Sequence, residues 1–545
     1  MKFNRIAYFL FVLLFFSYFN LNSQNEKLIR SSVEYLASDQ LKGRYTSSKE
    51  ELKAARYIAS RFKKAGLIPY NGFTDYLIPF EWEDLEKTSR QFIRWKNLQW
   101  DESDSLFPLI YSNDQEVKGP VMYYGDVSIQ EFTDDTEGNE ARGDIVAINI
   151  DFFKNNPHVA GDLDAIKAAR RVVEKGAIGI VFYTTRYKDE FKREYKAKSP
   201  AWGVPVFFAA FDLKKIVPEN DTLLLHSEIK RTKKKSYNVA GFKNNGSDKT
   251  IIIGAHYDHL GMGGENSLHR GNPEIHNGAD DNASGVAGMI YLAELLSKKQ
   301  NSRFNYLFIA FSGEELGLLG SSSFVKQIED KYKKQWFCMI NFDMIGRLDK
   351  QSKKLAVYGT GTAGEWKTII DKTNPGFQLN FHEDGVGPSD HTSFYLENLP
   401  VLHFFTGQHA DYHKPTDDVD KLNIEGIKEI SDWVAAIIDE LEKNPVLTFQ
   451  KTASGTSDKV RFKVTLGIIP DYVFSGKGVR IDGIIDDRPA QKAGLQKGDI
   501  ILQLGEFEVI DMQTYMKALG KFEKGQTVDV VVDRNGNVFK TNVTF

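Results

Sequence analysis

The chain has 545 residues, of which 41% are hydrophobic and 26% charged, and this length predicts about three domains of ~150 residues each. A formal net charge of −4 gives no reason to expect nucleic acid as a partner. Cys338 is the only cysteine, which excludes an intramolecular disulfide. The composition is that of an ordinary globular protein rather than of a disordered chain.

The N-terminus has the layout of a secretory signal peptide. Lys2 and Arg5 precede an apolar run over residues 6–19, and a polar stretch follows over 20–24. We therefore predict a signal peptide over residues 1–23 and a secreted or periplasmic protein. The apolar run is shorter than the ~20 residues that a membrane span needs, so no span is expected to remain after cleavage. An uncleaved N-terminal anchor is the alternative.

Helical spacing of apolar residues follows over residues 26–66. A break at 42–46 separates a first helix from a second one at 49–64, and Gly66 stands where a helix C-cap belongs. The aromatic-rich residues 73–105 have no clear pattern.

Residues 106–235 have the pattern of a small α/β domain. One predicted helix, at 163–175, lies among short β-type runs at 121–124, 144–150, 178–183 and 204–210. The region has no clustered histidine or acidic motif. It ends in the basic run 231–235, which is most simply a solvated linker.

From residue 236 on, near-continuous apolar runs predict strands that are buried on both faces. Predicted strands lie at 250–255, 304–311, 336–342, 355–358 and 401–405, and predicted helices at 286–296, 316–327 and 424–443. Strands that alternate with helices predict an α/β fold with a mostly parallel sheet and helices on both faces.

The remainder of the chain divides into a polar linker and a last module. We expect the linker at residues 444–458 and an independent β-rich domain at 459–545, with one clear helix at 512–519.

Side chains of the kind that bind metals follow several predicted strands, at the edge where ligands gather in open α/β sheets. They are His256, Asp258, Asp280, Glu314, Glu315, Asp343 and His413. Imidazoles with carboxylates suit zinc. Two histidines and three carboxylates can serve two zinc ions if one carboxylate bridges them. Asp280 and Asp281 lie in a Gly/Asn turn before a helix, where acids also act as N-caps and compensate the helix dipole.

Six motifs in this order resemble the di-zinc aminopeptidases, a family related to glutamate carboxypeptidase II. The motifs are GAHYDH (254–259), NGADDNASG (277–285), FSGEELGLLGS (311–321), NFDMIG (341–346), SDHTSF (389–394) and DYHKPTDDVDK (411–421). The resemblance implies a zinc exopeptidase fold of the phosphorylase/hydrolase-like kind over residues 236–443. Through YLASDQLKGR (35–44), it makes residues 24–105 the N-terminal part of the same domain.

The resemblance also implies two Zn²⁺ ions and assigns their ligands. His256 and Asp343 would bind one zinc, and Glu315 and His413 the other. Asp280 would bridge the two metals.

Further residues match positions with other roles in the family. Glu314 would be the general base, Asp258 would orient His256, and Tyr412 would help to hold the tetrahedral oxyanion. His391 would line the substrate pocket.

Three further expectations concern the local structure of the motifs. The family implies that the peptide bond between Asp280 and Asp281 can be cis. We expect His259 and His409 to have structural roles. Asp281 and Asp258 could also be structural caps.

The two other modules have resemblances of their own. Residues 106–235 resemble a protease-associated domain in RGDIVAI (142–148) and EKGAIGIVFY (174–183), and such inserts are expected to shape substrate access. Residues 459–545 resemble a PDZ domain in RPAQKAGLQKGDIILQLGE (488–506). LGIIPDY (466–472) departs from the usual Gly-rich carboxylate-binding loop. Capture of a C-terminal peptide by strand addition and a purely structural role are therefore both open.

The prediction for the whole chain is an exported zinc exopeptidase, in which a water activated by two zinc ions and Glu314 cleaves peptides or small proteins. The motifs fit an aminopeptidase best. A glutamate-releasing carboxypeptidase is the first alternative and would need a basic pocket for the terminal carboxylate. Cyclisation of N-terminal glutamine and a non-catalytic binding scaffold are the others.

Overall fold

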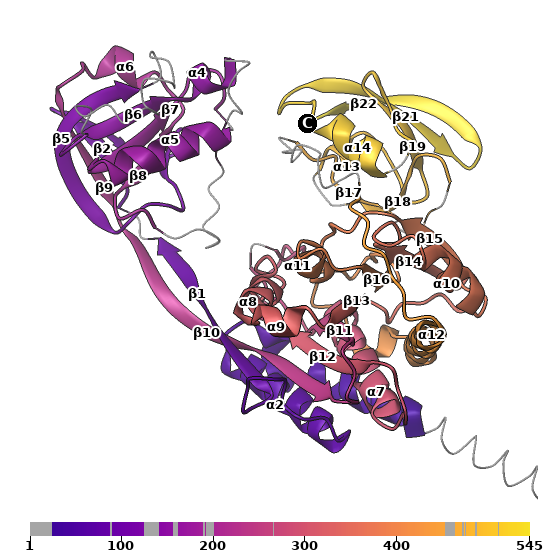
Figure 1. The fold of residues 1–545 in the computed structure, drawn as a ribbon. Coiled ribbons are helices and arrows are strands. Elements are labelled where there is room, and N and C mark those ends of the chain that lie inside the picture. Colours follow the sequence, from indigo (N-terminus) through magenta and orange to yellow (C-terminus); the bar gives the residue numbers. More distant parts are fainter. Residues whose placement is uncertain are drawn as a thin grey trace, which may run out of the picture. The chain divides into compact units, whose positions relative to one another are not determined.

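The structure is a computed structural model. It describes residues 24–545 except 88–89, 125–140, 156–161, 189–190, 192–200, 265, 453–463, 471–473, 475, 485–487 and 511. The predicted signal peptide and residues 453–458 of the predicted linker lie outside the described residues. The chain forms two compact units, one of residues 81–234 and the other of the segments that flank it (Figure 1).

An eight-stranded sheet forms the centre of the larger unit. Its order is β1 (Leu77–Lys87), β10 (Ile229–Lys243), β12 (Asn305–Phe311), β11 (Thr250–His256), β13 (Trp336–Phe342), β16 (Val401–Phe405), β14 (Lys354–Tyr358) and β15 (Gln378–His382). The four central strands, β12, β11, β13 and β16, are parallel. β10 and β14 pair antiparallel to them. The predicted α/β fold with a mostly parallel sheet is confirmed.

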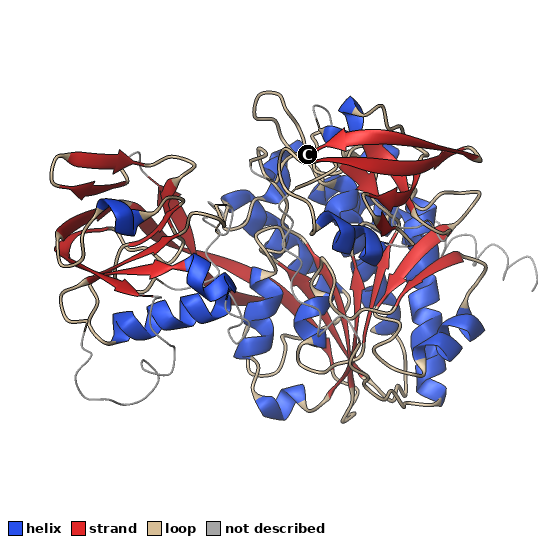
Figure 2. Ribbon diagram, turned by 90° about the horizontal axis from the view of Figure 1, so that it is seen from above, coloured by secondary structure: helices blue, strands red, loops and turns tan. Residues whose placement is uncertain are grey.

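Helices cover both faces of this sheet, so its central strands are buried on both sides (Figure 2). Successive strand residues point to opposite faces. Ile251 and Ile253 of β11 pack in a core with α2 (Lys49–Lys64), α7 (Gly285–Leu296), α10 (Trp366–Thr373) and α12 (Ile424–Lys443). Ile252, between them, packs with α8 (Leu319–Gln327) and α11 (His391–Tyr395). Burial on both faces explains why these strands have continuous apolar sequences.

Some elements differ from the sequence-based expectation. The unassigned residues 73–105 form β1 and the hairpin of β2 (Phe92–Trp95) and β3 (Leu98–Asp101). The basic run 231–235, predicted to be a linker, lies inside β10. Lys233 and Lys235 are exposed, whereas the half-buried Arg231 and Lys234 pair with Glu83 and Asp84 of β1.

The smaller unit, residues 81–234, has its own eight-stranded sheet and is α/β as predicted. The strand order is β3, β2, β9 (Thr222–Ser227), β5 (Gln115–Tyr124), β6 (Ile145–Asn149), β7 (Gly179–Tyr183), β8 (Val206–Ala209) and β4 (Leu106–Pro108). Its described helices are α4 (Ile150–Asn155), α5 (Asp162–Glu174) and α6 (Leu213–Ile216).

The last module is a six-stranded, β-rich domain, as predicted. Its strands are β17 (Ile468–Pro470), β18 (Val479–Ile484), β19 (Ile500–Leu504), β20 (Phe507–Glu508), β21 (Thr527–Arg534) and β22 (Asn537–Thr544). Two helices, α13 (Pro489–Lys492) and α14 (Met512–Leu519), complete it. The core of the module consists of its own apolar side chains.

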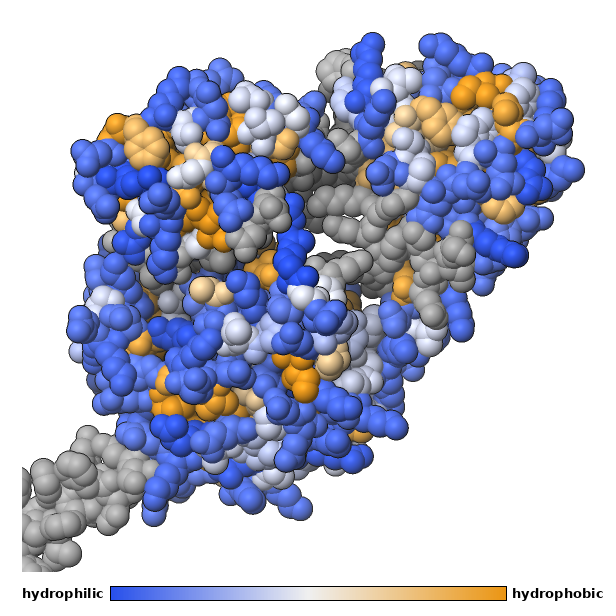
Figure 3. All heavy atoms as spheres, turned by 180° about the vertical axis from the view of Figure 1, so that it is seen from behind, coloured by the Kyte–Doolittle hydropathy of each residue, from blue (hydrophilic) through white to orange (hydrophobic). Residues whose placement is uncertain are grey.

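The surface in Figure 3 is mostly hydrophilic, with apolar side chains in small separate patches. No helix in the part of the chain that the structure describes combines the length and the apolar character that a bilayer span requires.

Glu51 is a buried acid at the contact between α2 and the end of β12. Its carboxylate accepts hydrogen bonds from the Ser236 and Ser312 hydroxyls and from the Ser47 backbone N–H. Burial raises its pKa to about 8, against the ordinary value of 4.5. The folded state therefore holds a proton that the unfolded state releases between these two pH values.

Glu51→Gln is predicted to flatten the pH dependence of stability. Because the pKa is raised in the folded state, the contribution of Glu51 is complete below about pH 4.5 and is lost as the pH rises towards 8. One proton of difference corresponds to a slope of about 1.4 kcal/mol per pH unit. Urea unfolding of both proteins between pH 5 and 8, with chelator present, measures the slopes. Equal slopes of unfolding free energy against pH in the two proteins would contradict the raised pKa of Glu51.

Candidate metal centre

The candidate site lies beyond the carboxyl ends of three neighbouring parallel strands. β11 ends at His256, which pairs in register with Phe311, the last residue of β12. β13 ends one residue before Asp343. The strand register thus brings side chains that are far apart in sequence to one edge, as expected for an open α/β sheet.

Two groups of ligand-type side chains meet at Asp281. In the first, His256 Nε2 lies 3.3 Å from Asp281 Oδ1 and 3.2 Å from Asp343 Oδ1. In the second, Glu315 Oε1 lies 2.8 Å from His259 Nδ1, which is 3.9 Å from Asp281 Oδ2. Each group has the geometry of a possible metal site, and Asp281 contributes one oxygen to each.

His413 joins the second group: its Nε2 is 3.3 Å from both Asp281 Oδ2 and Glu315 Oε2. The structure therefore brings together four of the five predicted metal ligands, His256, Glu315, Asp343 and His413.

Hydrogen bonds to carbonyl groups fix the orientation of the two predicted histidine ligands. The Nδ1 of His256 donates to the Asp258 carbonyl at 3.2 Å, and that of His413 donates to the Asn266 carbonyl at 2.8 Å. A carbonyl only accepts, so in each neutral ring Nε2 carries a lone pair. Both lone pairs face carboxylate oxygens at 3.2–3.3 Å. Lone pairs repel at such distances unless a proton or a cation lies between them.

The predicted bridging residue, Asp280, does not belong to either group, whereas its neighbour Asp281 belongs to both. Its Oδ1 accepts from the Gly346 backbone N–H at 2.6 Å and the Ser284 hydroxyl at 3.0 Å, and its Oδ2 lies 3.1 Å from His409 Nε2. Both oxygens are thus directed away from the two groups. The cis peptide bond is also shifted by one position, to Asp281–Asn282.

The turn that precedes α7 explains why Asp281, and not Asp280, reaches the two groups. Adjacent residues of this turn send their side chains in different directions, and the Asp417 carboxylate fixes the turn by accepting from the backbone N–H groups of Asp280 and Asp281. His409, expected to be structural, supports Asp280 rather than either metal group.

Asp258 orients His256 differently from the prediction. Its backbone carbonyl accepts the imidazole hydrogen bond, whereas its carboxylate stays 3.8 Å from Nδ1. The carboxylate instead accepts from the Thr46 hydroxyl at 2.9 Å and the Glu314 backbone N–H at 3.1 Å. Asp258 therefore also holds the backbone of the predicted general base in place.

Glu314 is half-buried and has several carboxylates around it. Burial is the largest factor that raises its pKa well above the ordinary value, and the neighbouring carboxylates Asp343, Glu315 and Asp390 raise it further. Burial opposes ionisation of Asp281 too, but the three histidines around it, in their protonated form, hold its pKa well below the ordinary range. The two carboxylates are thus driven towards opposite protonation states, which suits an acid–base group beside a permanent anion.

Of two further predicted site residues, Tyr412 lies at the second group and His391 lies in the protein interior. Tyr412 stacks on His413 with ring centroids 3.8 Å apart, which places it at the second group. His391 is fully buried, stacks on His403 at 4.5 Å, and has no hydrogen-bond partner for its ring nitrogens among the described residues. Burial lowers its pKa to about 3. His391 has no exposed surface in this structure, and its place beside a substrate pocket stays a prediction.

Arg44 is a functional-site residue that the sequence reasoning missed. It is almost fully buried, and its guanidinium donates to the carbonyls of Tyr257, Asn277 and Gly278 at 2.7, 2.6 and 3.0 Å. These carbonyls belong to the loop that follows His256 and to the turn that carries Asp281. A helical segment near the N-terminus thereby joins both loops of the candidate centre. Burial lowers the Arg44 pKa only to about 10, so the group stays charged.

The donor set of these groups fits zinc. Imidazole nitrogens combined with carboxylate oxygens are typical zinc ligands, whereas sets of oxygens alone suit magnesium or calcium. The acids at this centre would repel one another without a cation, and the described lone pairs converge. The residues therefore fit the two Zn²⁺ ions that the sequence implied.

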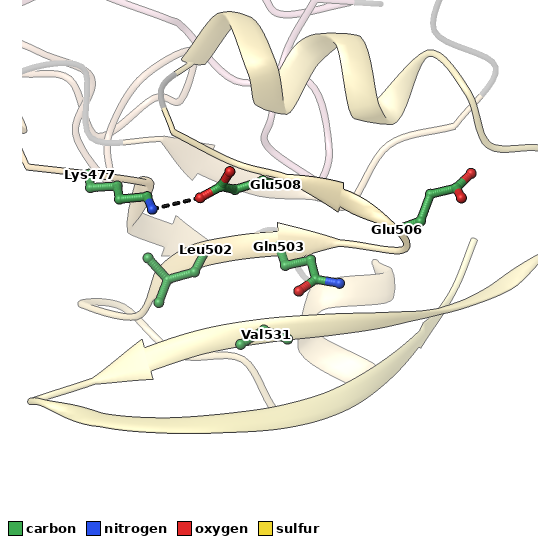
Figure 4. Close-up of a pocket in the computed structure, with 6 residues that line it drawn as sticks. All are labelled: Lys477, Leu502, Gln503, Glu506, Glu508 and Val531. Carbon is green, nitrogen blue, oxygen red and sulfur yellow. Dashed lines mark hydrogen bonds and ion pairs between the residues drawn. The ribbon is translucent and has the colours of Figure 1, made fainter.

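A separate pocket of about 370 Å³ lies on the last module. Lys477, Leu502, Gln503, Glu506, Glu508 and Val531 line it. Figure 4 shows Lys477 and Glu508 paired there, with Nζ and Oε1 2.6 Å apart. None of the metal-centre residues contributes to it.

Comparison with known proteins assigns two regions. Residues 238–438 match peptidase family M28, and residues 453–545 match the PDZ domain. The aminopeptidase YwaD of Bacillus subtilis is 26% identical over 318 residues, which are 55% of this chain and 65% of that protein. An aminopeptidase of Pseudomonas aeruginosa is 29% identical over 184 residues, 33% of this chain and 32% of that protein. The chain thus spans less than two thirds of these relatives.

An aminopeptidase from Aneurinibacillus sp. strain AM-1 is similar in structure, with a TM-score of 0.49 and 21% identity. The match covers 79% of this chain and 96% of that chain. The protease-associated assignment of residues 106–235 stays a prediction.

Arg44→Gln is predicted to destabilise the protein by at least about 3 kcal/mol, because it leaves several buried carbonyls without a donor, at about 1–3 kcal/mol each. Urea unfolding measures the loss. Arg61→Gln is the matched control, since Arg61 also ties the N-terminal helices to α7, through Glu294 at 2.9 Å. That pair is partly exposed, and its loss is expected to cost about 1 kcal/mol or less. Equal losses would contradict the role of Arg44.

Proposed function

Since residues 238–438 belong to peptidase family M28 and the last domain is a PDZ domain, we propose that this protein is a zinc-dependent aminopeptidase that removes N-terminal residues from peptides. The observation that carries the proposal is the pair of imidazole lone pairs, on His256 and His413, that face the two oxygens of Asp281. A proton or a cation must lie between each nitrogen and Asp281, and imidazoles combined with carboxylates are a donor set that suits zinc as that cation. The names of the relatives, which are aminopeptidases, support the same reaction.

Five side chains are proposed as ligands: His256, Asp343, Glu315, His413 and, as the bridge, Asp281 in place of Asp280. Two zinc ions held there would activate a water and polarise the scissile carbonyl.

Glu314 is the proposed general base. It would take a proton from the attacking water and give it to the leaving amine. Burial, together with the neighbouring carboxylates, favours the protonated form that the second step requires, while a bound cation favours the ionised form that the first step requires. Asp258 holds the Glu314 backbone, and Tyr412, beside His413, is proposed to donate to the developing oxyanion.

The charges around the centre favour an aminopeptidase over a carboxypeptidase. A carboxypeptidase needs a cation to bind the terminal carboxylate. Among the described residues, Arg44 and Arg347 beside this centre are already engaged, Arg44 by backbone carbonyls and Arg347 by Asp411 and Asp417 at 3.1 and 3.2 Å. The excess of carboxylates instead suits a substrate that presents an ammonium group.

Export and peptide binding by the last domain remain part of the proposal. The N-terminal pattern supports a secreted or periplasmic location. A C-terminal peptide of a substrate or partner is the kind of ligand that a PDZ domain takes by strand addition.

Glu314→Gln is predicted to lower kcat by at least about 100-fold while zinc content stays unchanged, because Gln keeps the shape but cannot transfer the proton. The assay is hydrolysis of a panel of aminoacyl-nitroanilides by the purified protein, before and after chelation and return of zinc. Activity that is lost on chelation and restored by zinc supports the proposal. Turnover of N-blocked, free-carboxylate substrates alone would favour the carboxypeptidase, and bound zinc without any turnover would contradict the enzymatic role.

Asp281→Asn is predicted to abolish tight binding of both zinc equivalents, because the amide offers one weak oxygen where the carboxylate offers two charged ones. Asp280→Asn is the matched neighbour and is expected to keep both equivalents, since its oxygens bind Gly346, Ser284 and His409. Metal analysis after dialysis against zinc-buffered solution measures the zinc equivalents that each variant binds. The reverse pattern would restore Asp280 as the bridge.

A further inference from the structure

We propose that His259 is a fourth protein ligand of the zinc site formed by Asp281, Glu315 and His413, so that the two metal sites of this protein are unequal. The inference rests on the proposed two-zinc function. It concerns a histidine that the sequence motifs gave no reason to place among the ligands.

The position of His259 is that of a ligand. Its Nδ1 lies 2.8 Å from Glu315 Oε1 and 3.9 Å from Asp281 Oδ2. His413 approaches the same two carboxylates, with Nε2 3.3 Å from each. The two imidazole rings stand at 69° with centroids 5.9 Å apart. His259 and His413 thus approach the same two carboxylates, through different oxygens of Glu315 and the same oxygen of Asp281.

The backbone holds this imidazole in place. Gly278 has φ of +56°, and a Cβ there would lie only 2.5 Å from His259 Cδ2 and 2.6 Å from Cγ. The ring therefore packs directly on the glycine of the turn that leads to Asp281. The His259 backbone N–H donates to the Arg44 carbonyl at 3.2 Å. Both contacts limit how far the ring can turn away from the carboxylates.

The surroundings of Nδ1 distinguish His259 from another buried histidine. His276 is equally buried, at 1% exposure, but its Nε2 pairs with the Ser267 hydroxyl at 2.7 Å and its Nδ1 donates to the Glu274 carbonyl at 2.9 Å. The Nδ1 of His259 instead faces only carboxylates that belong to a candidate metal group. Its Nε2 has no hydrogen-bond partner among the described residues, so Nδ1 is the nitrogen that we propose as the ligand atom.

The ligand count makes the two sites different. Four protein groups, two nitrogens and two oxygens, would complete a tetrahedral zinc site and leave no position for water, as in structural zinc sites. The other site has three groups, His256, Asp343 and Asp281, and keeps an open position, as in catalytic zinc sites. We therefore assign the site of the attacking water and of the substrate to the His256 side.

The test uses His259→Asn in the full-length mature protein. The Asn Nδ2 takes the place of His Nδ1 and can still donate a hydrogen bond to Glu315, but it is a poor zinc ligand. Loss of an outer-sphere hydrogen bond costs about 10–100-fold in metal affinity. Loss of a ligand is expected to exceed that limit, so the tighter of the two zinc equivalents should weaken by more than about 100-fold in competition with a chromophoric chelator.

Cobalt substitution gives a second readout that is independent of activity. One equivalent of Co²⁺ in the wild-type protein should give the intense visible absorption of tetrahedral cobalt, and His259→Asn should lose most of that intensity. His276→Asn is the control for the loss of a buried histidine and should keep the wild-type affinity and spectrum.

Three outcomes separate the hypotheses. Loss of both signals in His259→Asn, with His276→Asn unchanged, supports the fourth ligand. Wild-type affinity and spectrum in His259→Asn would overturn it and leave His259 as a hydrogen-bond donor to Glu315, without affecting the proposed function. Failure of the wild-type protein to bind two equivalents of metal would overturn both proposals.

Discussion

The position of one carboxylate, that of Asp281, determines how the rest of the centre is arranged. Its two oxygens lie in two different groups, each of which contains histidine and a second acid. A lone buried carboxylate would be expelled or protonated, because burial of an unpaired charge is unfavourable. Here the imidazoles on both sides hold its pKa far below the ordinary value. The fold around it keeps an anion where two positive charges can share it.

Much of the surrounding structure acts on backbone atoms rather than on the ligands themselves. Arg44 binds carbonyls of two loops, Asp417 binds two N–H groups of the turn at Asp281, and the Asp258 carboxylate binds the N–H of Glu314. Fixing the backbone sets the direction of each ligand side chain. Such positioning needs charged groups in the interior, and each of them is satisfied by several partners, which makes its burial tolerable.

Sequence patterns predicted the elements that depend on local periodicity. Residues 49–64, 424–443 and 512–519 were predicted as helices and are helices with those bounds, because their apolar spacing decides both the helix and its packing. Four residues of the candidate metal centre were noticed from their places after predicted strands, and the family resemblance assigned them their roles as ligands. Asp280 and Asp281 could not be distinguished, since the direction of each side chain depends on tertiary contacts with Gly346, His409 and Asp417. The contacts of His259 with Glu315 and of Arg44 with Tyr257 did not follow from the sequence, because these partners are more than 50 and 200 residues away.

The hydrogen bonds of Arg44 to Tyr257, Asn277 and Gly278 join residues that lie 213–234 positions apart, and the whole unit of residues 81–234 is inserted between them. Contacts of such sequence separation form late, after the ends of a very long loop have met. The loops of the metal centre therefore reach their final form only when the N-terminal helices dock on a sheet whose strands are made much later in synthesis. An unfinished chain holds the individual ligands but not the site, which couples the ability to retain zinc to the completion of folding.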